Sequence, residues 1–188
     1  MLVVILVSLS MRVHAMGYET EREISRELID MLDAQGVLAH ETDLTWVLQA
    51  LTDQLADHIR NPLYTFKIHL VYDRSINAMA IPDGNIFINL GTVLLAKDMD
   101  EIASVIAHEM GHCQHRHIPE AMRAQTRMTT ASIVGVIAGV LLSAANPEVG
   151  SAVVLSAIGG TENIKRQYSR KNELEADEFS RNLLNEAN

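Results

Sequence analysis

Five consecutive residues, His108-Glu109-Met110-Gly111-His112, have types and a spacing that could bind a metal ion and support hydrolysis. In a helix, which advances about 100° per residue, the two histidines return to nearly the same face one turn apart. Two imidazoles in this arrangement can bind one Zn²⁺ ion. Glu109 lies to one side of that face and could act as a general base beside a Lewis acid, the combination that amide hydrolysis requires.

A catalytic zinc also needs a third protein ligand, and the neighbouring residues fit this role poorly. His115 shares the face of His108 but lies one turn too far along the helix. His117 would point to the opposite side of the helix, where a structural hydrogen bond is expected. Cys113 also points elsewhere and is expected to be a small buried thiol.

An acidic motif, Glu173-Leu174-Glu175-Ala176-Asp177, lies in a charged segment that is predicted to be helical. Because Glu173 and Asp177 share one helix face, Glu173 could bind the metal while Asp177 accepts a hydrogen bond from a ligand histidine. Spacing alone leaves a second interpretation equally open, in which both carboxylates lie on a solvated acidic face.

The segments around these motifs predict an α+β domain that is mostly helical, with a small antiparallel sheet. Apolar residues at helical spacing and capping residues predict helices over 19–32, 43–59, 98–116 and 162–188. Alternating or apolar runs predict strands over 66–70, 78–81 and 86–88, the last two joined by a turn at Pro82-Asp83-Gly84. The metal motif therefore lies in the helix that follows the sheet.

The stretch from 128 to 160 contains a single charged residue, Glu148. Its two apolar runs, 131–145 and 149–159, predict an apolar helical hairpin over 131–159. Neither run reaches the roughly 18 residues that a membrane-spanning helix needs. Two interpretations stay open, a hairpin buried in the core or a lid over the metal cleft that contacts a membrane surface.

Composition restricts the class of protein further. The balance of 15 basic and 24 acidic residues, a net charge of −9, argues against binding to nucleic acid. The single cysteine excludes a disulfide framework and a multi-cysteine zinc cluster. The apolar or small residues 1–10 followed by Val13-His14-Ala15 predict a signal peptide over 1–15, which leaves 16–188 as one domain.

The motifs together resemble those of the zinc metallopeptidases typified by HtpX and the CAAX prenyl endopeptidase. The resemblance rests on the motif at 108–112 and on Ser169-Arg170 followed by E-x-E-A-D at 173–177. The segment 77–88 is similar to that of the soluble periplasmic BepA-like and LoiP-like members. The resemblance extends from about Tyr18 to the C-terminus, and because family members usually continue further, a C-terminally incomplete domain is expected.

This resemblance implies a zincin-like (gluzincin) metallopeptidase fold with one Zn²⁺ per chain. It also implies a role for each motif residue. The implied metal ligands are His108, His112 and Glu173, the implied base is Glu109, and the implied orienting group for a ligand histidine is Asp177. The donor for the oxyanion of the tetrahedral intermediate has only two nearby candidates, Tyr168 and His115.

The function that these residues favour is zinc-dependent endopeptidase action on unfolded or misassembled proteins of the bacterial envelope, by an exported, periplasmic and membrane-associated protein. The strand residues Ile86, Phe87 and Ile88 precede the metal helix closely and are expected to bind an extended substrate by strand addition. Two alternatives stay open: a chaperone-like protein-binding module with a plugged or structural zinc site, and a His-rich metal-binding protein.

Overall fold

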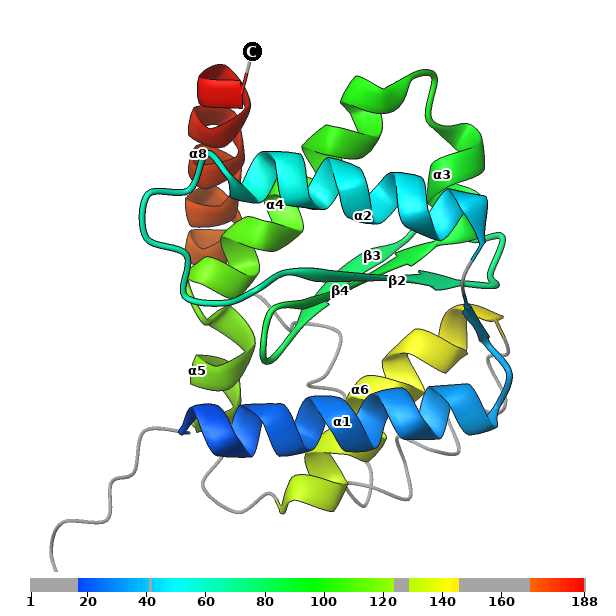
Figure 1. Ribbon diagram of the computed structural model, residues 1–188. Helices are drawn as coiled ribbons and strands as arrows, with labels where there is room; N and C mark the ends of the chain where they lie inside the picture. Colours follow the sequence, from blue (N-terminus) through cyan, green and yellow to red (C-terminus); the bar gives the residue numbers. More distant parts are fainter. Residues whose placement is uncertain (1–16, 41, 124–128, 146–169, 188) are drawn as a thin grey trace, which may run out of the picture.

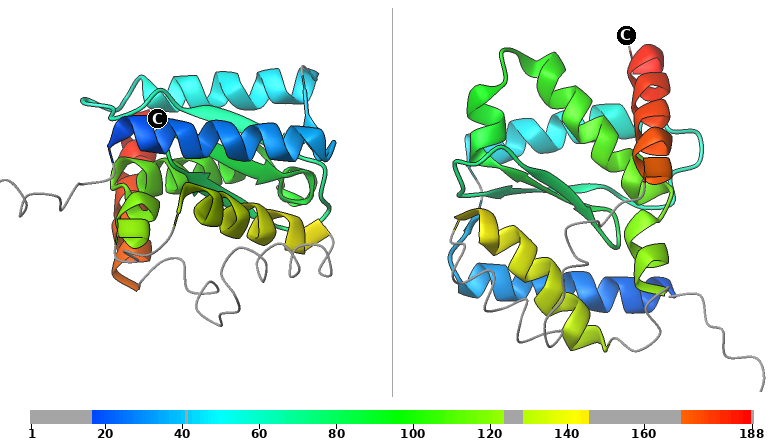
Figure 2. Two further views of the ribbon diagram at one scale, coloured as in Figure 1. Left: turned by 90° about the horizontal axis from the view of Figure 1, so that it is seen from below. Right: turned by 180° about the vertical axis from the view of Figure 1, so that it is seen from behind.

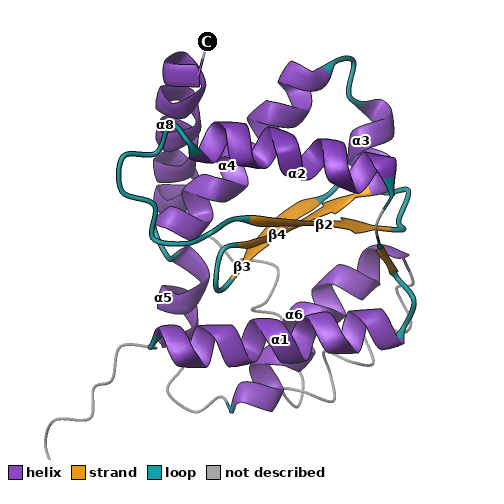
Figure 3. Cartoon of the chain, in the orientation of Figure 1, coloured by secondary structure: helices purple, strands orange, loops and turns teal. Residues whose placement is uncertain are grey.

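The computed structural model describes residues 17–40, 42–123, 129–145 and 170–187. Within these ranges the chain is mostly helical, with one small sheet (Figure 3). The helices are α1 (Tyr18–Ala34), α2 (Asp43–Ala56), α3 (Leu90–Leu95), α4 (Met99–Gln114), α5 (His117–Arg123), α6 (Thr130–Ala145) and α8 (Arg170–Ala187). The strands are β1 (Leu38–Ala39), β2 (Lys67–Val71), β3 (Ala78–Ile81) and β4 (Asn85–Asn89). The predicted signal peptide and the second apolar run, 149–159, lie outside the described residues.

The sheet has the strand order β1-β2-β4-β3 and is mixed rather than antiparallel. β1 pairs antiparallel with β2, and β3 pairs antiparallel with β4. The central pair is parallel, with Ile68 of β2 opposite Ile86 of β4 and Leu70 opposite Ile88. The prediction of an antiparallel sheet is therefore wrong for this pair. After the turn that follows β3, the chain forms β4 between β3 and β2 and runs in the same direction as β2.

β4 occupies an interior position because it is apolar on both faces. Ile86 and Ile88 belong to the core cluster that includes residues of α2 and α4, whereas Phe87 belongs to the cluster that includes residues of α1 and α6. All three side chains are fully buried. Strands that are buried on both faces have continuous apolar runs, whereas half-buried strands alternate.

Helices cover both faces of the sheet (Figures 1 and 2). On one face, α2 and α4 pack through residues such as Leu48 and Ile106. On the other face, α1 and α6 pack through residues such as Leu28 and Ile137. α8, the red helix in Figure 1, packs against α4, so the two predicted motifs lie on adjacent helices.

α6 contains the first apolar run of the predicted hairpin. Its inward-facing side chains are buried in the core with α1 and the sheet: Ile133, Val134, Ile137, Ala138 and Leu141. For the described part of 131–159, the structure therefore favours the core interpretation. No helix within the described ranges is both long and apolar enough to span a bilayer. A membrane-surface contact through 131–159 stays a prediction.

The ends of α4 show which local signals set the helix that carries the metal motif. Asp98 and Asp100 are both candidate caps by residue type, and it is the Asp98 side chain that caps the first turn by accepting a hydrogen bond from the Glu101 N–H at 3.0 Å. The helix ends at Gln114, two residues before the predicted end. Arg116 has a φ of 55°, a left-handed conformation that a right-handed helix cannot continue through.

Candidate metal centre

α4 and α8 approach closely at Gly111, between the two motif histidines. A Cβ atom at this position would lie 3.0 Å from the Cα of Ala176 and 3.1 Å from its carbonyl oxygen. Because glycine has no Cβ, the two helix backbones can pack at this distance. The acidic motif of α8 is thereby brought against the histidines of α4.

His108, His112 and Glu173 place three ligand atoms around one point. The two Nε2 atoms lie 3.0 Å apart. Oε2 of Glu173 lies 3.5 Å from the Nε2 of His108, and Oε1 of Glu173 lies 3.8 Å from the Nε2 of His112. Ligand atoms at about 2.0–2.1 Å from a tetrahedral zinc are roughly 3.3 Å apart, a value that the three measured distances bracket. Two imidazoles and a carboxylate in this arrangement fit a zinc ion.

The electrostatic environment keeps His112 available for a metal. Burial, together with the neighbouring His108, His117 and His115, lowers the pKa of His112 to about 3. The Nδ1 of His108 lies 3.0 Å from the Asp177 carboxylate, the contact proposed for Asp177 from the sequence. A neutral imidazole keeps the lone pair that a metal requires.

Glu109 lies next to His108, His112 and Glu173, on the side that faces the sheet. Its carboxylate accepts a hydrogen bond from the backbone N–H of Ala80 in β3 at 2.6 Å. Burial raises the pKa of Glu109, the Ala80 hydrogen bond opposes this rise and the charge of Glu173 adds to it, so that the pKa is about 7. Glu109 and His108 line the same cleft, of about 350 Å³. A carboxyl group placed here can exchange a proton with a group bound in the cleft.

His117 lies against His112, contrary to the expectation that it would point to the opposite side of the helix. The two Nδ1 atoms are 2.9 Å apart. The left-handed Arg116 ends the helix, so His117 begins α5 and turns back toward His112. The Nε2 of His117 lies 3.2 Å from the carboxylate of Glu175. Sequence reasoning missed this arrangement, because helical periodicity does not apply across the turn.

Comparison with known sequences identifies the family. Residues 45–188 match the profile of peptidase family M48. The chain belongs to this family. The beta-barrel assembly-enhancing protease of Escherichia coli K12 is 27% identical over 164 residues, which cover 87% of this chain and 34% of that protein. The protein of the same name from Yersinia pestis is 29% identical over 156 residues, 83% of this chain and 32% of that protein. The chain therefore spans about a third of the length of these two relatives.

This chain covers a larger share of another relative. Metalloprotease LoiP of Escherichia coli K12 is 24% identical over 165 residues, which cover 87% of this chain and 62% of that protein. The family match includes the metal motif of α4 and the acidic motif of α8, so the residues that meet in the structure lie within the M48 region.

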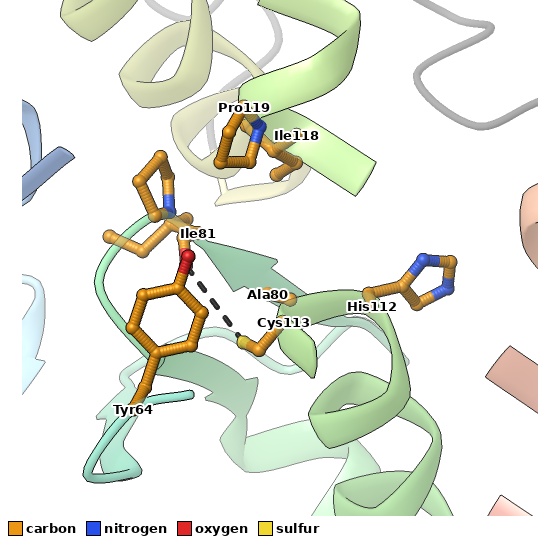
Figure 4. A pocket seen from close by; sticks show the side chains of 8 residues that line it. Tyr64, Ala80, Ile81, His112, Cys113, Ile118 and Pro119 are labelled. Atoms are coloured by element: carbon orange, nitrogen blue, oxygen red, sulfur yellow. Dashed lines mark hydrogen bonds between the residues drawn. The ribbon is translucent and has the colours of Figure 1, made fainter. Parts of the chain in front are cut away.

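The remaining residues of the motif region do not join the metal group. Cys113 and His112 point in opposite directions from α4 (Figure 4). The Cys113 thiol is buried, 3.9 Å from the carbonyl oxygen of Ile81, and burial raises its pKa. His115 donates from Nδ1 to the Gly111 carbonyl at 2.9 Å, and its ring stacks on that of His117. Tyr168, the other oxyanion candidate, lies outside the described residues.

The substrate-binding role expected of Ile86, Phe87 and Ile88 needs correction. These residues lie in β4, which pairs with β2 on one side and β3 on the other, and their side chains are fully buried. An interior strand has no unpaired backbone groups with which another strand could pair. Among the described strands, β3 is the edge next to the candidate site, and its residue Ala78 lines the same cleft as Glu109. The three consecutive apolar residues of β4 were the sequence signal for an interior strand.

Proposed function

We propose that this chain is the zinc-dependent endopeptidase domain of an M48 metalloprotease, with a zincin-like (gluzincin) fold. The observation that supports this most strongly is the position of Glu109 in a cleft, between the group His108, His112 and Glu173 and the edge strand β3. When bound, one zinc ion per chain would polarise the scissile carbonyl and lower the pKa of water.

The protein's own residues divide the remaining work. His108, His112 and Glu173 would hold the ion, and Asp177 would hold the His108 ring through Nδ1. The N–H of Ala80 binds Oε2 of Glu109, so Oε1 is the oxygen assigned to proton transfer. Glu109 would accept a proton from the attacking water and deliver it to the leaving amine.

The variant Glu109→Gln tests this function. We expect it to retain one zinc ion per chain and to cleave an unfolded protein such as casein at least about 100-fold more slowly, because the general base is lost. Glu178→Gln, at an exposed position of α8, is the matched control and should cleave at the wild-type rate.

Two outcomes would contradict the proposal. Unchanged function of Glu109→Gln would favour the chaperone-like module with a plugged or structural zinc site. More than one tightly bound zinc ion per chain would favour a His-rich metal-binding protein.

We further propose that β3 binds the substrate as an extended strand. Outward-facing backbone groups recur at every second residue of an edge strand, and the N–H of Ala80 already faces outward to Glu109. The backbone groups of Ala78 therefore face the same side, where Ala78 lines the cleft. Strand addition recognises extended backbone rather than one side chain, which suits unfolded or misassembled substrates.

The variant Ala78→Pro tests the role of β3, because proline has no N–H to donate. We expect cleavage of an unfolded substrate to fall about tenfold, the size of one lost hydrogen bond, with zinc binding retained. Ala78→Val keeps the N–H and is the control. Equal cleavage by the wild type and Ala78→Pro would exclude this strand as the binding site.

We propose that the substrates are misassembled envelope proteins and that the protein is exported and periplasmic. Two relatives are named for enhancing beta-barrel assembly, a process of envelope proteins. If residues 1–15 are a signal peptide, the mature protein begins at Met16. Mass spectrometry of the protein from the envelope fraction should find this N-terminus, and an intact Met1 would contradict export by cleavage. Flotation with liposomes tests the predicted membrane-surface contact of 131–159.

A further inference from the structure

Each candidate ligand histidine begins a chain of hydrogen bonds that ends on a carboxylate of α8. The first chain is short: the Nδ1 of His108 lies 3.0 Å from the Asp177 carboxylate. The second chain has one more member. The Nδ1 of His112 lies 2.9 Å from the Nδ1 of His117, whose Nε2 lies 3.2 Å from the Glu175 carboxylate. This second chain has no role in the function proposed above.

The carboxylate at the end of the second chain sets the direction of its hydrogen bonds. Glu175 also accepts from the Lys171 ammonium group at 3.2 Å, and a carboxylate that is paired with an ammonium group can only accept. The Nε2 of His117 must therefore carry the proton that it donates to Glu175. Since a neutral imidazole has one donor and one acceptor nitrogen, the Nδ1 of His117 is an acceptor.

The same reasoning determines which ring nitrogen of His112 carries the proton. Because the Nδ1 of His117 is an acceptor, the Nδ1 of His112, 2.9 Å away, must donate to it. The Nε2 of His112 is left with its lone pair directed at the Nε2 of His108, 3.0 Å away. In His108 the Nδ1 donates to the Asp177 carboxylate, which leaves the lone pair on the Nε2. Two lone pairs and the Glu173 carboxylate that face one another are a cation site.

We propose that His117 and Glu175 are positioning residues for this centre, which hold His112 in its Nδ1–H tautomer and fix the orientation of its ring. The inference rests on the metal site of the proposed function. α8 thus supplies one ligand and anchors both histidines, through three carboxylates that lie within five residues of sequence. Hydrogen bonds to the far nitrogen of a ligand histidine fix its tautomer and raise its basicity toward the metal.

The position of His117 is itself held by a polar cluster that joins α1 to the end of α4. The guanidinium group of Arg116 pairs with the buried carboxylate of Glu21 and lies over the Tyr18 ring, 4.8 Å from its centroid. Glu21 also accepts a hydrogen bond from the Tyr64 hydroxyl at 2.6 Å. These contacts stabilise the left-handed turn at Arg116, and His117, only 2% exposed, follows directly from that turn.

The variant Glu175→Ala tests the proposal in the full chain. We expect the Kd for zinc, measured by competition with a chelating dye, to rise about 10- to 100-fold. In the metal-free protein, two-bond ¹H–¹⁵N correlation spectra at pH 8 should show His112 as a single Nδ1–H tautomer in the wild type and as a mixture of tautomers in the variant. Glu178→Ala removes an exposed carboxylate of the same helix and should leave both the Kd and the tautomer unchanged.

A pair of variants at His117 separates positioning from packing. His117→Phe fills the space but cannot accept a proton, so it should weaken zinc binding as much as Glu175→Ala does or more. His117→Gln offers a side-chain oxygen to the Nδ1–H of His112 and should recover part of the lost affinity. Because Glu175→Ala does not replace a fully buried side chain, it tests the proposal even if the His117→Phe variant fails to fold.

The outcomes are distinct from those that concern the proposed function. A Glu175→Ala variant with wild-type zinc affinity, or with weaker affinity but an unchanged His112 tautomer, would overturn the positioning role. Neither readout depends on proteolysis, and the tautomer is read without metal. A failure of Glu109→Gln to lose cleavage would therefore reject the protease function without deciding the role of His117 and Glu175.

Discussion

α4 and α6 are both 16 residues long and lie on opposite faces of the same sheet, yet they bury different chemistry. α4 buries polar groups, Glu109 and His112, among its apolar side chains. The buried side chains of α6 that the structure describes are apolar or glycine. Burying a polar group is costly unless it is hydrogen-bonded, and each of the two in α4 has a partner, Ala80 or His117.

This difference suggests a division of labour between the two helices. α6 contributes stability through apolar burial, which requires volume and shape but no specific partner. In α4 the desolvation cost of Glu109 and His112 is offset because β3 and α5 supply hydrogen-bond partners for them. Perturbations of α6 should therefore change stability alone, whereas perturbations of the α4–α8 contact should change metal binding.

The largest expected effect is on the α4 side, from Glu173→Ala. At a free zinc concentration 1,000 times the Kd, zinc should stabilise the wild type by about 4 kcal/mol. Loss of a ligand that weakens binding 100-fold or more would reduce this gain to about 1.4 kcal/mol or less. Urea unfolding with and without zinc measures the gain, with Glu178→Ala as control. An undiminished zinc gain in Glu173→Ala would remove Glu173 from the ligand set.

Ile137→Ala should have an effect of similar size, on the α6 side. Ile137 is 1% exposed, and truncating a buried isoleucine to alanine costs about 2–5 kcal/mol. We expect the free energy of unfolding to fall by that amount equally in metal-free and zinc-loaded protein. The zinc gain itself should not change. If Ile137→Ala reduced the zinc gain, the two faces of the sheet would be energetically coupled and the division of labour would be wrong.

A smaller effect should come from His69, a residue of β2 that stacks on Phe87, on the α6 face. Its Nε2 donates to Asn85 at 2.9 Å, and its burial lowers its pKa, with a small further lowering by Lys67 and opposing contributions from Asn85 and Asp33. Because the unfolded chain binds the proton more readily, His69 contributes stability above about pH 6.5. That contribution is lost as the pH falls toward the lowered pKa.

The variant His69→Gln isolates this contribution. Urea unfolding of metal-free protein between pH 7.5 and 5 should show a shallower loss of stability in the variant, by at most about 1.4 kcal/mol per pH unit. His112 and His117 also have lowered pKa values, but they titrate in both proteins and cancel in the difference. Identical pH profiles would mean that His69 is not protonated differently on folding.

Helical periodicity and capping signals predicted the elements that carry the site. α4 and its Asp98 cap, α1 and the strands β2 and β3 agree with the predicted segments within one or two residues. α2 begins at Asp43, the start of the predicted segment 43–59, and Thr42 caps it through a reciprocal hydrogen bond with Thr45, whereas Asp43 was the cap expected from residue type. Such local features depend on residues close together in the chain, which is why a sequence pattern can predict them.

The sequence by itself determined that His108, Glu109 and His112 share one helix and that Glu173 and Asp177 share another, because helical spacing is local. Only the tertiary structure decided which strand is the edge, since strand order depends on which apolar run is buried on both faces. It also brought His117 back to His112 and on to Glu175, through a left-handed turn at Arg116 that contacts with distant residues of α1 hold in place. A contact between distant segments depends on the packing of whole helices, and no local spacing rule encodes it.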